Sequence, residues 1–217
     1  MRRALAIKEL RDTAGIVLGA VFFHAMFVVS AMGLPVWPWW WRHDFLIPFV
    51  NDQFLAYYVV VSGCLAAALG LRQSAFETVF GTEQFLLHRP LTREWLIGTK
   101  LLVGGCLYLI VAAVPILVYA WWAATPGTHA SPFEWSMTAT AWKVWLTTTV
   151  LYLGGFLSGI RPGRWQGTRL LPLVAAIGLV YVLVAIPWLW GWCLLAVVLI
   201  DGLLVTTIFH VARTRDF

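Results

Sequence analysis

The chain has 217 residues, of which 61% are hydrophobic and only 12% are charged, and its mean hydropathy is +0.81. This composition excludes the ordinary classes of soluble globular and disordered protein and indicates an integral membrane protein. The net charge of +5 comes from basic residues spread over several loops, with no dense patch interleaved with aromatic residues. We therefore do not expect nucleic-acid binding.

The apolar runs predict an all-α integral membrane protein with six transmembrane helices in one domain, residues 1–217. Runs of about 17 to 25 mainly apolar residues are long enough to cross the hydrocarbon core, because a helix satisfies its own backbone hydrogen bonds. The predicted spans are residues 14–34, 54–71, 96–123, 137–160, 170–186 and 188–210. Without the fifth, which is short and ends at Pro187, the two termini would lie on opposite sides.

The basic residues predict the orientation of these spans, since lysine and arginine collect on the cytoplasmic side. With six spans, 13 of the 15 basic residues fall on one side, and only Arg42 and Lys143 fall on the other. Most of the 14 tryptophans lie near the predicted outer ends, where indoles favour the headgroup zone. We expect both termini in the cytoplasm and a multi-pass protein of a prokaryotic cytoplasmic membrane.

Residues 1–13 predict an amphipathic helix ahead of the first span. Its two faces are formed by Ala4, Ile7, Leu10 and Ala14 and by Lys8, Glu9 and Asp12. A cleaved signal peptide is disfavoured, because the apolar run is longer than a signal h-region and acidic residues precede it. The cysteines, Cys64, Cys106 and Cys193, lie in predicted spans without CxxC spacing, so we expect neither a disulfide framework nor a zinc site.

A polar segment, residues 72–95, separates the second and third spans. Its first part predicts a short amphipathic helix that Pro90 ends, because the residue before a proline is pushed out of the α region. The next helix has a start signal, with Thr92 as N-cap, Glu94 in the first turn and Leu91 spaced to contact Leu96. The residues alone leave two interpretations open, a surface that docks a cytoplasmic partner and a hairpin that only connects two spans.

One string of residues resembles the coupling segment of ABC-2 type transporter permeases: Glu77, Gly81-Thr82-Glu83, Leu86-Leu87, Arg89-Pro90-Leu91-Thr92-Arg93 and Gly98-Thr99-Lys100-Leu101. The stretch Lys8 to Asp12, "KELRD", is similar to the connecting helix that precedes the first span in that family. The resemblance implies that these two segments, residues 1–13 and 72–95, dock on an ATP-binding subunit. The residues that it places at this contact are Lys8, Glu9, Arg11, Glu77, Glu83, Leu86, Leu87, Arg89, Pro90 and Arg93.

The resemblance further implies that the chain is the permease subunit of an exporter that works by alternating access. It would act as a dimer with a second permease chain, which is either an identical copy or a different chain. The chain has no P-loop motif, so ATP and Mg²⁺ are expected on the separate ATP-binding subunit, and this chain is expected to bind no cofactor or metal and not to be an enzyme itself. An intramembrane enzyme is disfavoured, because neither H-E-x-x-H nor G-x-S-x-G is present. A non-transporting membrane anchor or assembly factor that binds a cytoplasmic partner stays open.

Two ionisable residues are expected deep in the membrane, His24 in the first span and Asp201 in the sixth. Such groups need a partner or a water-filled path, so we interpret them as contacts of a translocation pathway and hypothesise that they pair with each other. The alternative is that each residue forms its hydrogen bonds locally, Asp201 with a neighbouring helix or with Thr206 and Thr207. The aromatic-rich outer half favours amphipathic or lipid-like cargo, although the sequence does not identify it.

Other features allow simpler interpretations. Lys143, between two tryptophans, is expected to snorkel to the interface. The G-x-x-x-G pairs at residues 15–19 and 155–159 allow close helix packing, inside the chain or in a dimer. Thr147, Thr148 and Thr149 either line a translocation path or form hydrogen bonds back to their own helix.

The outer loops differ from those of some members of the resembling family. Those members carry a longer segment between the fifth and sixth spans, whereas residues 187–191 of this chain allow only a tight turn. This leaves the tryptophan-rich loop 35–53 as the candidate to cover the outer surface.

Overall fold

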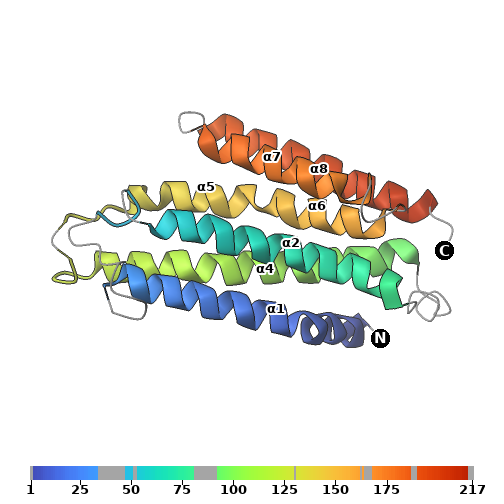
Figure 1. Cartoon of the computed structure of the whole chain (residues 1–217), viewed down its shortest axis with the longest axis horizontal. Helices are drawn as coiled ribbons and strands as arrows, with labels where there is room; N and C mark the ends of the chain where they lie inside the picture. Colours follow the sequence, from blue (N-terminus) through green and yellow to red (C-terminus); the bar gives the residue numbers. More distant parts are fainter. Residues whose placement is uncertain are drawn as a thin grey trace.

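The computed structural model of the chain describes residues 2–33, 47–50, 53–80, 92–129, 131–161, 163, 168–186 and 190–214. Within these residues the secondary structure is entirely helical. The α-helices are α1 (Arg2–Ala31), α2 (Phe54–Phe80), α4 (Arg93–Ala124), α5 (Ala139–Thr147), α6 (Thr149–Ile160), α7 (Leu171–Ala185) and α8 (Trp190–Thr214). Short 3-10 turns, Trp135–Thr138 and Thr168–Leu170, precede α5 and α7. Figure 1 shows the helices running along one long axis, with both ends of the chain at the same end of the bundle.

Five helical segments are long and apolar enough to cross a membrane: Ala4–Ala31, Phe54–Phe76, Arg93–Ala124, Thr168–Ala185 and Trp190–Thr214. They match five of the six predicted spans. The chain is therefore built as a multi-pass membrane protein, as the composition predicts.

The fourth predicted span, residues 137–160, is not one continuous helix. It is divided at Thr148 into α5 and α6, which lie end to end in Figure 1. The hydroxyls of Thr147 and Thr148 donate back to Val144 O at 3.0 and 2.8 Å, and the Thr149 hydroxyl oxygen lies 2.6 Å from Leu146 O. The Tyr108 hydroxyl of α4 also bonds to this turn, through Trp145 O at 2.8 Å. These contacts compete with the backbone ladder, which explains the break that apolar periodicity did not predict.

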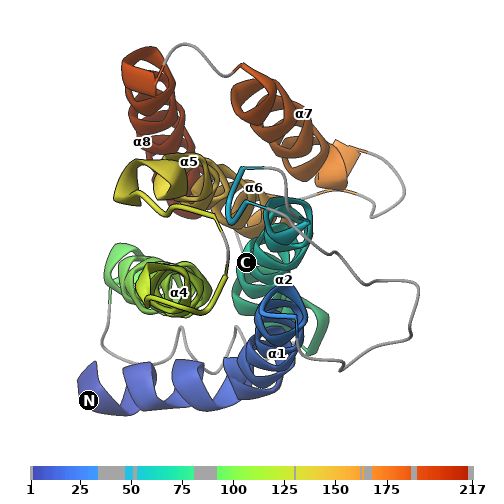
Figure 2. The same cartoon turned by 90° about the vertical axis from the view of Figure 1, so that its left-hand side faces the viewer.

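The first helix is longer than predicted, because the segment before the first span and the span itself form one helix, α1. Figure 2 shows that the start of α1 runs across the end of the bundle, whereas the rest of the helix follows the bundle axis. Thr13 lies in this part of the chain, and its hydroxyl donates to Glu9 O at 2.8 Å. Threonines that bond back to the preceding turn often bend helices.

The second helix also continues beyond the predicted end at Leu71, as far as Phe80. Arg72 lies over the ring of Phe76, with 3.2 Å from its guanidinium carbon to the ring centroid, and Gln73 is buried. Residues 72–80 thus extend α2, since no helix breaker occurs before Gly81. Residues 81–91 of the predicted coupling segment, including Glu83, Leu86, Leu87, Arg89 and Pro90, lie outside the described residues, and of Glu77 only the backbone is described.

The third long helix, α4, begins as the sequence predicts. Thr92 is its N-cap, and the Thr92 side chain accepts a hydrogen bond from Trp95 N at 3.4 Å. Glu94 lies in the first turn, where a negative charge is favourable. The end of the polar segment is therefore fixed by local capping chemistry.

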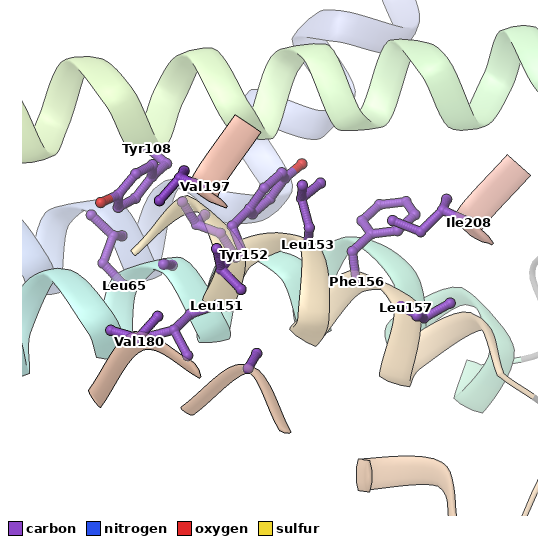
Figure 3. Packing of buried hydrophobic residues seen from close by; sticks show 14 of the residues in the cluster. Leu65, Tyr108, Leu151, Tyr152, Leu153, Phe156, Leu157, Val180, Val197 and Ile208 are labelled. Carbon is purple, nitrogen blue, oxygen red and sulfur yellow. The ribbon is translucent and has the colours of Figure 1, made fainter. Parts of the chain in front are cut away.

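Helices α2 and α6 are in close contact because glycines remove side-chain bulk between them. A Cβ on Gly70 would lie 2.1 Å from Tyr152 O, and one on Gly155 would lie 2.9 Å from Ala67 O. Figure 3 shows Tyr152 and other α6 side chains in the large hydrophobic core that this contact organises. The second G-x-x-x-G pair therefore packs inside the chain. At the first pair, residues 15–19, a Cβ on either glycine would have no atom of the described residues within 4 Å.

Candidate functional site

A buried polar network joins four helices near the end of the bundle where α1 and α4 begin. Glu9, Gln73 and Lys100 are each no more than 4% exposed. Lys100 Nζ lies 3.9 Å from Glu9 Oε1 and donates a hydrogen bond to Gln73 O at 3.1 Å. Gln73 Nε2 lies 3.5 Å from Glu9 Oε2, and the Tyr152 hydroxyl of α6 donates to Gln73 Oε1 at 2.8 Å. We call Glu9, Gln73, Lys100 and Tyr152 the inner polar network.

Gly104 makes room for this network. A Cβ at Gly104 would lie 2.0 Å from Gln73 Oε1 and 2.5 Å from the Tyr152 hydroxyl oxygen. Neither distance is compatible with a side chain, so any residue larger than glycine would displace both polar groups. The glycine therefore has a packing role on α4, one helical turn after Lys100.

The network opposes relative movement of the helices that it joins. Two charged groups taken out of water are costly unless geometry and further hydrogen bonds satisfy them, and removing one partner leaves an uncompensated buried charge. Here Lys100 and Glu9 also contact Gln73, which in turn contacts Tyr152. A displacement that separates α1 from α4 would therefore pull apart the Glu9–Lys100 ion pair, and it would strain the hydrogen bonds that connect both residues to Gln73 of α2.

His24 lies farther along α1, in a second polar contact with α2. Its Nδ1 lies 2.9 Å from Ala20 O and its Nε2 lies 3.1 Å from the hydroxyl oxygen of Ser62. A carbonyl oxygen only accepts, so Nδ1 carries a proton, and in the neutral ring Nε2 accepts from Ser62. His24 is thus satisfied by its own helix and by α2.

Asp201 has a different partner, on α6. The Thr149 hydroxyl donates to Asp201 Oδ2 at 2.6 Å, whereas Asp201 Oδ1 is buried and has no hydrogen-bond partner among the described residues. The hypothesis that His24 and Asp201 pair with each other is wrong, because α1 and α8 lie on opposite sides of the bundle (Figure 2). The other suggested partners, Thr206 and Thr207, bond back to Leu203 O of their own helix.

Two further basic residues cap helix ends inside the chain. Lys143 is buried and donates to Ile186 O at the end of α7, so it does not snorkel as predicted. Arg169 is also buried, and its guanidinium donates to Ser158 O at 3.2 Å and Gly159 O at 2.6 Å at the end of α6. Cations suit helix C-termini, where carbonyls lack intrahelical partners. The sequence signal that could have suggested both contacts is a single basic residue near the predicted end of a helix.

The predicted partner-facing residues divide into two groups. Arg11 and Arg93 are exposed and Lys8 is partly exposed, with its Nζ 3.9 Å from Asp12 Oδ2. Glu9 faces the interior instead, where it contacts Lys100, so in this conformation its carboxylate is not on a docking surface. At the exposed rim, the Arg213 guanidinium of α8 donates to Glu94 of α4 at 2.6 Å.

Within the described part of the chain, no group of three or more His, Cys, Asp and Glu residues is arranged to hold a metal ion. The three cysteines are all free thiols. Comparisons with protein-family models, curated proteins and solved structures give no match, so the function must be argued from this chain alone.

Proposed function

We propose that the chain is the membrane subunit of an ATP-driven transporter of the ABC-2 permease type. In this proposal a separate subunit binds and hydrolyses ATP, and this chain moves the cargo across the membrane. The proposal begins with the resemblance of residues 8–12 and 77–101 to the connecting and coupling segments of that family.

The observation that carries the proposal is the contact between these two segments. Glu9 belongs to the first and Lys100 to the last part of the second, and their charged groups are 3.9 Å apart inside the bundle. The sequence resemblance contains no information about this contact. A transporter that receives a mechanical signal at both segments needs them joined, and a buried ion pair joins them more firmly than a surface pair would.

The arrangement of the helices also supports the proposal. If the end-to-end pair α5 and α6 crosses the membrane as one rod, the five long helices become part of a six-span bundle with both termini on one side (Figure 1). This is the side that receives 13 of the 15 basic residues under the six-span prediction. Six spans with cytoplasmic ends are the topology that the resemblance implies.

The inner polar network provides a route from the partner to the spans. Closure of the ATP-binding subunits would move residues 77–93 and the start of α1. Lys100 and Gln73 flank the first of these segments, and Glu9 lies in the second. Tyr152 then links Gln73 to α6, so a displacement at the cytoplasmic end would reach the centre of the bundle. Alternating access requires such a rigid connection.

The test is to express the chain together with the genes that flank it and to purify whatever binds it. We expect an ATP-binding subunit to co-purify and its ATPase activity to respond to the membrane subunit. Arg89→Glu and Glu83→Lys, in the predicted coupling segment, should release this subunit or uncouple its hydrolysis. Glu134→Lys is the matched control, because Glu134 is exposed at the opposite end of the bundle.

Two outcomes would contradict the proposal. If no nucleotide-binding subunit co-purifies and both charge reversals leave the purified complex unchanged, the resemblance is misleading. If a cytoplasmic partner co-purifies but hydrolyses no ATP, the chain is an anchor or assembly factor instead of a permease.

A further inference from the structure

Residues 47–50 form a turn with an unusual residue at its third position. The turn is closed by a hydrogen bond from Val50 N to Ile47 O at 3.2 Å, and Pro48 occupies its second position. Phe49, at the third, has φ of 65°. A proline followed by a residue of positive φ is the pattern of a type II turn, in which glycine or asparagine normally follows the proline. A bulky residue rarely adopts this conformation, so local preference does not account for Phe49.

The reason for Phe49 lies in its tertiary contacts. The side chain is buried, 5% exposed, and its ring centroid lies 5.2 Å from that of Phe54, 4.9 Å from Tyr119 and 6.3 Å from Phe133. The Phe54 ring in turn stacks on Tyr119 at 4.6 Å. Edge and tilted contacts at these distances are favourable for aromatic rings. The strained turn thus directs an aromatic side chain from a loop into a cluster formed by α2, α4 and the segment before α5.

This aromatic cluster lies at the end of the bundle opposite the termini (Figure 1). One face of α2 leads inward from it, through Phe54, Tyr58 and Ser62, which are 3%, 2% and 0% exposed. These residues are spaced by four, so they follow one another along the helix. The Tyr58 hydroxyl on this face donates to Ala112 O at 2.9 Å, and Ser62 one turn farther bonds to His24. Gln73 of the inner polar network lies near the other end of the same face. Phe49 therefore lies at the outer end of a buried face of α2, on which the polar side chains of Ser62 and Gln73 are separated by the apolar Leu65, Ala66 and Leu69.

We propose that Phe49 is a plug that closes the outer end of the bundle, where it packs against α2, α4 and the segment before α5. The turn at residues 47–50 holds the ring in place at the cost of an unfavourable backbone conformation. Withdrawal of the ring would relieve that strain and expose the Tyr58 and Ser62 face of α2 to the outer solution. The idea that this plug gates cargo rests on the proposed function. The idea that it closes the bundle does not.

The experiment measures closure directly, without transport or ATP hydrolysis. The three cysteines are replaced, and Ser62→Cys is introduced as a reporter in the full chain, which is expressed in whole cells. Labelling of the reporter thiol with a membrane-impermeant reagent should be slow, because residue 62 is fully buried. Phe49→Gly suits the turn better than phenylalanine and removes only the plug. We expect the reporter thiol to be labelled roughly tenfold faster or more in this variant, which corresponds to about 1.4 kcal/mol in the free energy of opening.

Val50→Gly is the control, since Val50 belongs to the same turn but its side chain is 61% exposed. It should leave the labelling rate unchanged. If Phe49→Gly does not fold, as judged by thermal unfolding of the purified protein, Phe49→Leu replaces it and should still accelerate labelling through the lost ring contacts. Equal rates in wild type and in the folded Phe49 variant would overturn the plug. That result would leave the ATP-binding partner untouched, and a missing partner would likewise not alter the labelling rates.

Discussion

Gly104 is the residue on which the inner polar network depends most directly. We predict that Gly104→Ala destabilises the protein by about 1 to 3 kcal/mol, the usual cost of forcing extra volume into a packed interior. The added methyl would overlap Gln73 Oε1 and the Tyr152 hydroxyl, so the hydrogen bond between them would be lost as well. Thermal or denaturant unfolding of the purified protein in detergent measures the change.

The adjacent Gly105 provides a matched control for this prediction. Among the described residues, a Cβ there would have only an ordinary van der Waals contact, with Tyr152 Cε1 at 3.8 Å. Gly105→Ala should be neutral or stabilise the helix by up to about 1 kcal/mol, because alanine is the better helix former. If the two variants unfold alike, the network does not depend on the space at Gly104.

Between elements, the same reasoning applies to the contact of α2 with α6. We predict that Gly70→Ala lowers the free energy of unfolding by about 2 kcal/mol or more, because its methyl would meet Tyr152 O and Phe156 N, both backbone atoms, which cannot rotate away. Gly19→Ala should have no such cost, since its methyl would have no atom of the described residues within 4 Å. Unfolding of the two variants side by side measures the difference. A large loss in Gly19→Ala would instead indicate that this face of α1 is packed against a second chain.

The sequence predicts helices well where the determinant is local or compositional. Apolar runs locate five long helices, and capping chemistry locates the start of α4 at Thr92. Prediction from the sequence fails where a contact with another helix determines where a helix ends or breaks. The continuation of α2 past Leu71 is accompanied by burial of Gln73 in the polar network, and the break at Thr148 is held partly by the Tyr108 hydroxyl of another helix. Neither contact follows from periodicity along a single segment.

The candidate site shows the same limit. Glu9 and Lys100 each stand out in the sequence, one as part of an amphipathic segment and one as part of a motif, but their pairing depends on how α1 crosses the bundle. Asp201 is recognisable as a residue that needs a partner, yet its partner Thr149 lies beside the helix break. The sequence identifies buried polar and charged residues that need a hydrogen-bond or charge partner. The fold decides which neighbouring residues provide that partner.

For the whole molecule, the topology depends on whether α5 and α6 together cross the membrane. We predict that they do, and that single cysteines at their two ends report from opposite sides in a background without native cysteines. Glu134→Cys should react with an impermeant thiol reagent on intact cells, whereas Arg161→Cys, at the end of α6, should react only after permeabilisation. Thr214→Cys, at the end of α8, gives an independent reading, because it shares a side with Arg161 if α7 and α8 both cross and lies on the opposite side if only one of them does. If residues 134 and 161 react from the same side, the rod does not cross, the termini lie on opposite sides, and the six-span permease is excluded.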